Sequence, residues 1–303
     1  MKKWIALFLA VVMTVALFAC GKAEAPATEA PAAETPAAET PAEAPAEAKI
    51  TTINEGKLTV ATSPDFAPYE FYAIDDSGKA TLAGFELALA QYIADYLKLE
   101  LEIIPMDFDG TLAELQNKAV DLGMAGYSPK PERAEFMDFS DIFYTGGQSF
   151  VCTQANKDKF TSLADTNKKE YSIGAQIGSI QVDLAKKNSP DADIVELTKV
   201  TDIIAELISG KLAGAYIETA VAETYAKNYP ELCVVLPVPY EQEGSVVGVY
   251  KGNEALLKGV NEAIAAAKAD GSMDQFIADA NELASGNIHQ GLLDENGQPK
   301  KAD

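Results

Sequence analysis

Short apolar runs alternate with amphipathic stretches along most of this chain, and this alternation restricts its fold more than any other feature. Lys57–Thr62 and Leu101–Pro105 read as strands, and Phe85–Leu97 between them reads as a helix. The residues expected on one face of that helix are Phe85, Leu89, Tyr92, Ile93 and Tyr96. A helix at Thr111–Lys118 and a strand at Val120–Ala125 continue the pattern. Repeated β-α-β units predict an α/β fold with a mainly parallel sheet flanked by helices.

A second unit with the same pattern begins near Phe150. Its strands are expected at Gln148–Thr153, Tyr171–Ala175, Ile194–Leu197, Ala213–Ile217 and Cys233–Leu236, with helices between them. Two last helices, Asn253–Asp270 and Met273–Leu283, are expected to return to the first unit. The roughly 250 residues that follow Lys49 are enough to build two compact lobes.

Three loops follow predicted strands of the first unit. They are Ser63–Phe66, Met106–Gly110 and Gly126–Arg133. Sites in such sheets lie beyond the carboxyl ends of the strands, so these loops are expected to meet at one edge.

The N-terminus has the pattern of an export signal. Lys2 and Lys3 precede an apolar run from Trp4 to Phe18, which is too short to span a bilayer, so residues 1–19 are predicted to be a signal peptide. Leu17-Phe18-Ala19-Cys20 resembles a lipobox, which implies that Cys20 is lipidated and anchors the protein to the cell membrane. An ordinary cleaved signal with an incidental cysteine is the alternative. Residues 20–49 add an Ala/Pro/Glu-rich segment that cannot form a core and is predicted to be a disordered spacer.

Composition excludes several classes of protein. The net charge of −22, from 46 acidic and 24 basic residues, argues against nucleic-acid binding. With one histidine and three cysteines, a Cys/His metal cluster is not expected, and no cofactor is predicted. There is no phosphate-binding P-loop and no second long apolar run, so the chain is neither an ATPase nor a permease. Cys152 and Cys233 are expected to be either a disulfide or two buried thiols.

The segment Asp121–Asp141 reads D-L-G-M-A-G-Y-S-P-K-P-E-R-A-E-F-M-D-F-S-D and follows Met106-Asp107-Phe108-Asp109-Gly110. Together these stretches resemble the first-lobe ligand motif of the family 3 extracellular solute-binding proteins, which deliver amino acids to ABC importers. The resemblance extends from about Lys57 to Ile277. It implies a two-lobed periplasmic-binding-protein-like fold of type II with two hinge strands. The first lobe is then expected at residues 50–146 and 247–303, and the second at 147–246.

The resemblance also implies a set of ligand contacts in the first lobe. Arg133 matches the arginine that pairs with the ligand α-carboxylate, helped by the Ser128 hydroxyl and the Gly126 backbone. The alternative is that Arg133 is a surface residue that caps a helix or pairs with Glu132 or Glu135. The aromatic rings expected around the ligand side chain are Phe66, Phe108 and Tyr127, and Ser63 is expected beside them.

In the second lobe, the stretch Gln176–Gln181 resembles the loop that closes over the ligand carboxylate with backbone N–H groups at a helix N-terminus. Gln176, Ser179 and Ile180 are the contacts expected there. Glu218 stands where the family usually has an aspartate that pairs with the ligand α-ammonium group. The longer glutamate departs from the pattern and leaves the identity of the amino acid open.

The resemblance implies a monomeric receptor that binds a free amino acid and hands it to an ABC permease, which has an ATPase behind it. Two other functions stay open. Some dehydratases that act on prephenate or arogenate share this fold, and Glu218 would be their general acid. A ligand-sensing partner of a receptor is the third possibility.

Overall fold

The computed structural model describes residues 49–74, 79–241 and 244–285. The predicted signal peptide, Cys20 and the spacer up to residue 48 lie outside these residues, as does His289. In the part of the chain that is described, no helix has the length and apolar character needed to cross a membrane.

The first lobe is built on a five-stranded sheet with strand order β5-β1-β6-β13-β7. Its strands are β1 (Lys57–Thr62), β5 (Glu100–Pro105), β6 (Leu122–Gly123), β7 (Met137–Phe139) and β13 (Gly248–Tyr250). In the central register Val60 lies opposite both Ile103 and Leu122. Val60 is fully buried because helices cover both faces of this sheet.

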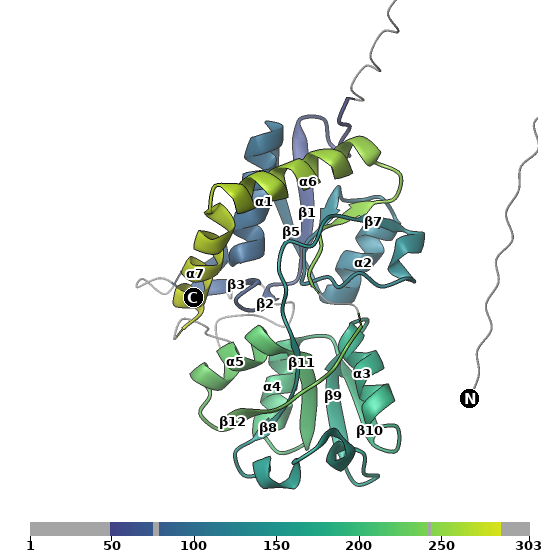
Figure 1. The fold of residues 1–303 in the computed structure, drawn as a ribbon, viewed down its shortest axis with the longest axis vertical. Coiled ribbons are helices and arrows are strands. Elements are labelled where there is room, and N and C mark those ends of the chain that lie inside the picture. Colours follow the sequence, from purple (N-terminus) through teal and green to yellow (C-terminus); the bar gives the residue numbers. More distant parts are fainter. Residues whose placement is uncertain (1–48, 75–78, 242–243, 286–303) are drawn as a thin grey trace, which may run out of the picture. The chain divides into compact units, whose positions relative to one another are not determined.

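The second lobe repeats this arrangement with strand order β10-β9-β11-β8-β12. Its strands are β8 (Gln148–Thr153), β9 (Ser172–Gln176), β10 (Asp193–Leu197), β11 (Gly214–Glu218) and β12 (Leu232–Pro237). Figure 1 shows the two sheets and the two segments that run between them. The predicted two-lobed α/β fold is therefore confirmed.

Four of the five strands in each sheet point the same way, as the pairings show. The strand of opposite direction is β13 in the first lobe and β8 in the second. Each of them is the first strand after the chain has passed from one lobe to the other. Both sheets are therefore mixed, and the two antiparallel pairings in each arise from these passages.

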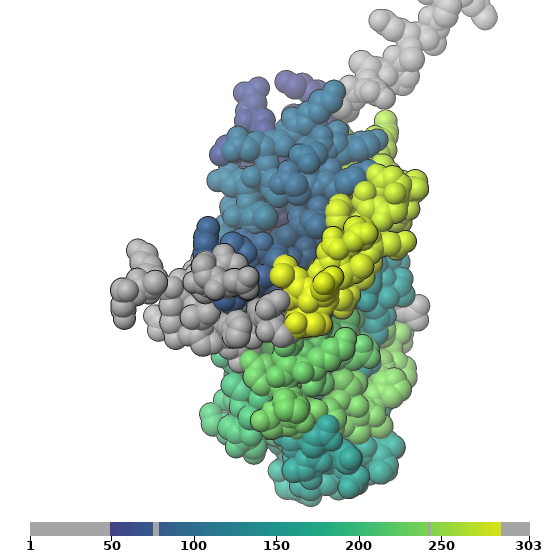
Figure 2. Space-filling model, turned by 90° about the vertical axis from the view of Figure 1, so that its left-hand side faces the viewer, coloured from purple at the N-terminus to yellow at the C-terminus, as the bar shows by residue number. Residues whose placement is uncertain are grey.

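The helices of the first lobe are α1 (Phe85–Leu97), α2 (Phe108–Gln116), α6 (Glu254–Ala269) and α7 (Ser272–Ala284). Those of the second lobe are α3 (Ile180–Asn188), α4 (Val200–Ile208) and α5 (Thr219–Asn228). Both α6 and α7 pack against α1, and Figure 2 shows α7 in yellow beside the blue first lobe. Tyr96 was expected on the buried face of α1, but it is 45% exposed. Ala90 and Ala94 occupy that face instead.

The passages between the lobes lie side by side. Tyr144 bridges Ser245, Ser149 pairs with Pro237, and the Val238 N–H donates to the Gln148 carbonyl over 2.7 Å. The hinge is therefore a pair of antiparallel segments.

Some elements were not predicted from the sequence. A small sheet contains β2 (Asp65–Phe66), β3 (Glu70–Ile74) and β4 (Ala80–Ala83). Short 3-10 helices lie at Arg133–Glu135, Lys157–Lys159 and Leu163–Thr166. In addition, α2 begins at Phe108 and not at Thr111, so Phe108 opens a helix and does not belong to a loop.

Candidate functional site

A small closed cavity lies where the two lobes meet. Its lining residues are Phe66, Phe108, Ala125, Gly126, Ser128, Arg133, Gln176, Ser179, Ile180 and Gln181. The cavity has a volume of about 10 Å³, which is about the space that one water molecule needs. The three first-lobe loops singled out in the sequence all contribute to this lining. In this closed arrangement the lobes must separate before a molecule as large as an amino acid can enter.

Arg133 supplies the positive charge of the cavity. Its side chain is only 4% exposed and it lies in the 3-10 helix that follows the Ser128 loop. Nη1 donates to the Ser128 carbonyl over 3.0 Å, and Nη2 donates across the lobe boundary to the Gly178 carbonyl over 3.1 Å. Burial lowers the pKa of Arg133 from its usual value. A carboxylate in place of the Gly178 carbonyl would be a stronger acceptor for this guanidinium, because it carries a full negative charge.

Two aromatic rings form the apolar walls. Phe66 is 8% exposed and Phe108 is 5% exposed, and the guanidinium carbon of Arg133 lies 5.5 Å from the centre of the Phe108 ring. Gly126, at φ 63°, faces Phe66, and a Cβ there would come within 2.7 Å of that ring. Any side chain at position 126 would therefore collide with Phe66 and displace its ring.

Tyr127 does not line the cavity, although the sequence reading placed it in the pocket. It is fully buried, its ring packs edge-on against Phe108, and its hydroxyl donates to Thr111 Oγ1 over 2.6 Å. Tyr127 therefore packs against both Phe108 and Arg133, since its ring centre also lies 5.5 Å from the guanidinium carbon of Arg133.

The second lobe contributes the loop between β9 and α3. Ser179 stands just before α3, and its hydroxyl donates to the Gln176 carbonyl over 2.6 Å. Because Ser179 also lines the cavity, the N-terminus of α3 faces the cavity. The first backbone N–H groups of α3 point in this direction, and a negative charge is favoured there. Gln181 was missed in the sequence although it lies in the first turn of this helix, and its amide donates to Gln148 Oε1 over 2.7 Å.

Glu218 lies near the lobe boundary but does not line the cavity. It caps α5, with the Val221 N–H donating to Oε2 over 2.9 Å and the Gly147 N–H donating to Oε1 over 3.2 Å. Burial raises the pKa of Glu218 to about 7 despite these bonds. Ser63 is another predicted contact that does not line the cavity. Its hydroxyl donates to Asp65 Oδ1 over 2.8 Å.

Asp65 joins the lobes and was not among the predicted contacts. The Val200 N–H at the start of α4 donates to its Oδ2 over 2.6 Å, and Gln176 Nε2 donates to the same atom over 3.2 Å. Burial raises the pKa of Asp65 to about 6. The sequence signal that could have identified Asp65 is its position directly before Phe66. Because Phe66 lines the interlobe cavity, a polar side chain next to it is close to the other lobe.

Two ion pairs also cross between the lobes. Lys130 pairs with Asp183 of α3, and Lys199 lies 3.9 Å from Asp107. These pairs are partly exposed, so each contributes little to the free energy of closure on its own.

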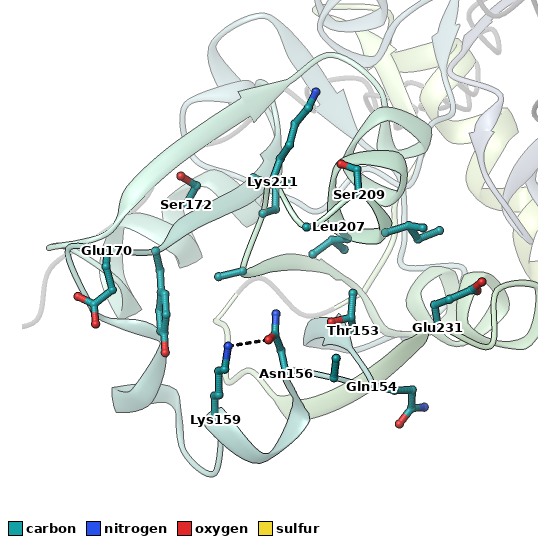
Figure 3. A pocket seen from close by; sticks show the side chains of 16 residues that line it. Thr153, Gln154, Asn156, Lys159, Glu170, Ser172, Leu207, Ser209, Lys211 and Glu231 are labelled. Carbon is teal, nitrogen blue, oxygen red and sulfur yellow. Dashed lines mark hydrogen bonds between the residues drawn. The ribbon is translucent and has the colours of Figure 1, made fainter.

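A larger cavity lies in the second lobe alone. Its volume is about 720 Å³, and Figure 3 shows Thr153, Lys159, Glu170 and Glu231 around it. None of the predicted ligand contacts lines it. In the described stretches of the chain, no group of three His, Cys, Asp or Glu side chains is placed to hold a metal ion.

The chain is similar to several known proteins. The sequence model of the bacterial extracellular solute-binding proteins, family 3, matches residues 58–279. The arginine-binding extracellular protein ArtP of Bacillus subtilis is 30% identical over 281 residues, which cover 91% of this chain and 96% of ArtP. The crystal structure of the substrate-binding protein AbpA of Streptococcus pneumoniae, bound to L-arginine, gives a TM-score of 0.72 at 34% identity and covers 76% of this chain and 96% of AbpA. Cyclohexadienyl dehydratase of Pseudomonas aeruginosa is 24% identical over 192 residues, 63% of this chain and 70% of the enzyme.

Proposed function

This chain belongs to family 3 of the bacterial extracellular solute-binding proteins, and we propose that it is the receptor of an amino-acid ABC importer. A free amino acid binds between the two lobes, the lobes close over it, and the permease recognises the closed form. The lobe boundaries expected at residues 146–147 and 246–247 are part of this proposal.

The buried Arg133 guanidinium is the observation that carries the proposal. It lies in the interlobe cavity with two donors directed at backbone carbonyls, and no carboxylate lines that cavity. A ligand α-carboxylate supplies the missing negative charge, and the N-terminal amides of α3 hold it from the other side. Because Arg133 lies in the first lobe and α3 in the second, both contacts form only when the lobes are closed.

L-Arginine is the first ligand to test, because ArtP and AbpA are described with arginine. Phe66 and Phe108 line the cavity, and aromatic rings attract a cationic side chain. Asp65, the residue before Phe66, is a carboxylate at the lobe boundary, where it accepts from Gln176 and Val200 of the second lobe.

Lipid attachment at Cys20 belongs to the same proposal, although Cys20 lies outside the described residues. A lipid anchor with the Ala/Pro/Glu-rich spacer would keep the receptor near its permease. The family and ArtP are extracellular, which fits a receptor on the outer side of the membrane.

A dehydratase is the second candidate function. The buried Glu218, with a pKa raised to about 7, is a carboxylic acid able to give up a proton near neutral pH. However, its carboxylate already accepts two backbone N–H groups and lies off the cavity. The receptor function therefore fits the site better. If the wild-type protein releases product from prephenate and Glu218→Gln does not, the dehydratase function is favoured instead.

A thermal-shift screen against the twenty amino acids tests the proposed receptor function, because a ligand bound only by the folded state raises the midpoint. We expect at least one amino acid to raise the midpoint of the wild-type protein and of Lys159→Ala, an exposed control, but not of Arg133→Ala. If no amino acid shifts the wild-type protein, or if Arg133→Ala responds as the wild type does, the proposal is wrong.

A further inference from the structure

Two cysteines face each other in the second lobe, far from the interlobe cavity. Cys152 of β8 lies directly opposite Cys233 of β12 in the antiparallel register, and their sulfur atoms are 3.8 Å apart. Directly opposed residues of antiparallel strands have Cα atoms about 4.5 or 5.5 Å apart. A disulfide needs about 4.4 to 6.8 Å, so rotation of the two side chains is enough to join the sulfur atoms.

We propose that Cys152 and Cys233 form a disulfide in the exported protein. Members of this family are extracellular, and disulfides persist in oxidising compartments outside the cytoplasm. The two thiols are the free cysteines of the described residues. Because they are direct cross-strand neighbours, closing the bond moves neither strand.

The oxidant is another disulfide, either a small one such as oxidised glutathione or that of a thiol oxidoreductase. Cys233 is partly exposed and Cys152 is buried, so Cys233 reacts first. Its thiolate attacks one sulfur of the oxidant and releases the other as a thiolate. The Cys152 thiolate then attacks the Cys233 sulfur and releases the second half of the oxidant. The two cysteines lose two electrons, the oxidant disulfide gains them, and the two cysteine protons pass to the released thiolates.

In the reduced protein, burial and the neighbouring Cys233 raise the pKa of the Cys152 thiol to about 12, so little Cys152 thiolate is present near neutral pH. We therefore expect disulfide formation with a small oxidant to accelerate as the pH rises.

The position of the bond gives it a structural role. β12 is the edge strand of its sheet, its pairing with β8 is irregular between Val234 and Leu236, and the second passage to the first lobe follows it. The first passage leads into β8 at Gln148. A bond between Cys152 and Cys233 therefore joins the two strands that continue into the hinge segments, toward the end of the ladder away from the hinge.

The test is to oxidise the full-length protein with oxidised glutathione, block free thiols after unfolding, and map the peptides by mass spectrometry. Peptide mapping separates Cys152 and Cys233 from Cys20. We expect a peptide that links Cys152 to Cys233, near-complete loss of labelling at both, and a melting midpoint roughly 4–10 °C above that of the reduced protein.

The Cys152→Ala/Cys233→Ala variant and the single variant Cys233→Ser serve as controls, and both should melt at the same temperature with and without oxidant. Cys233→Ser changes only a partly buried side chain, so it covers the case in which the double variant fails to fold. Free thiols at both positions after oxidation, a lasting mixed disulfide with glutathione, or a disulfide between two molecules would each overturn the inference. None of these readouts requires an amino-acid ligand, so the result is independent of the proposed function.

Discussion

At the scale of single residues, ligand binding depends on the planar guanidinium fork of Arg133. We expect Arg133→Lys to weaken binding of the amino acid found by the thermal-shift screen by roughly 10- to 100-fold, since a lysine keeps the charge but not the bidentate geometry. Titration calorimetry of the wild type and of both Arg133 variants measures this change. Equal affinities for Arg133→Lys and the wild type would mean that charge alone, and no directed hydrogen bonds, holds the ligand.

Asp65 is expected to favour closure without touching the ligand carboxylate. Its Oδ2 accepts from Val200 and Gln176 of the second lobe, and hydrogen bonds to charged groups contribute about 1.5–3 kcal/mol each. We expect Asp65→Ala to lower ligand affinity by roughly tenfold or more and to enlarge the unliganded protein in small-angle X-ray scattering. The exposed Asp141→Ala is the matched control. Unchanged scattering and affinity in Asp65→Ala would show that Asp65 is only a structural cap of α4.

The sequence was informative about residues whose role is visible in a short motif. Phe66, Phe108, Gly126 and Arg133 all line the cavity, because each follows one of the parallel strands of the first-lobe sheet and such strands end at the same edge. Tyr127 lies in the core and not in the lining, and one-dimensional spacing does not fix which way a loop side chain points. Asp65 was missed because its partners, Gln176 and Val200, are more than a hundred residues away.

At the scale of elements, a buried pair of glutamates joins β3 and α1 to the ligand loop. Glu70 and Glu86 are fully buried, and the Gly126 N–H donates to Glu86 Oε1 over 3.0 Å. The other three oxygens of the pair have no donor from the rest of the described protein. A proton on one carboxyl supplies the missing donor, and burial raises the pKa of Glu86 to about 8 and that of Glu70 well above its usual value.

This pair makes the stability of the fold depend on pH. Between the ordinary glutamate pKa and about 8 the folded protein binds more protons than the unfolded chain, so the free energy of unfolding falls as the pH rises. We expect Glu70→Gln to reduce this fall, because its amide donates to Glu86 at every pH. Urea unfolding at about pH 5 and pH 8 measures the fall, which should be on the order of 1 kcal/mol or more for the wild type.

The exposed Glu100→Gln is the control for that experiment. It should keep the pH dependence of the wild type. A Glu70→Gln variant whose stability changes with pH as the wild type does would show that the pair does not share a proton.

The bounds of helices and strands with a clear periodic pattern were predicted more accurately than those of the other elements. β1, β8 and α1 have the predicted bounds, because their apolar patterns are long and uninterrupted. β2 and β13 have two and three residues, too few for a periodic pattern to show. Local sequence patterns also could not predict that each sheet is mixed, because the strand of opposite direction results from the passages between the lobes.

At the scale of the whole folded unit, binding and closure are one event. The lobes already contact each other through Arg133, Asp65 and two ion pairs, and the cavity between them has a volume of only about 10 Å³. A ligand must therefore replace some of these contacts with better ones to favour closure. A charged carboxylate does so for the Arg133 guanidinium, which otherwise donates to neutral carbonyls.

The most direct test of this central claim compares the amino acid found by the thermal-shift screen with its methyl ester by titration calorimetry. The two ligands share the ammonium group and the side chain and differ at the carboxylate. We expect the ester to bind the wild-type protein at least roughly a hundredfold more weakly, and Arg133→Ala to remove most of this difference. Equal affinities of the acid and the ester for the wild type would mean that Arg133 does not hold the ligand through its carboxylate.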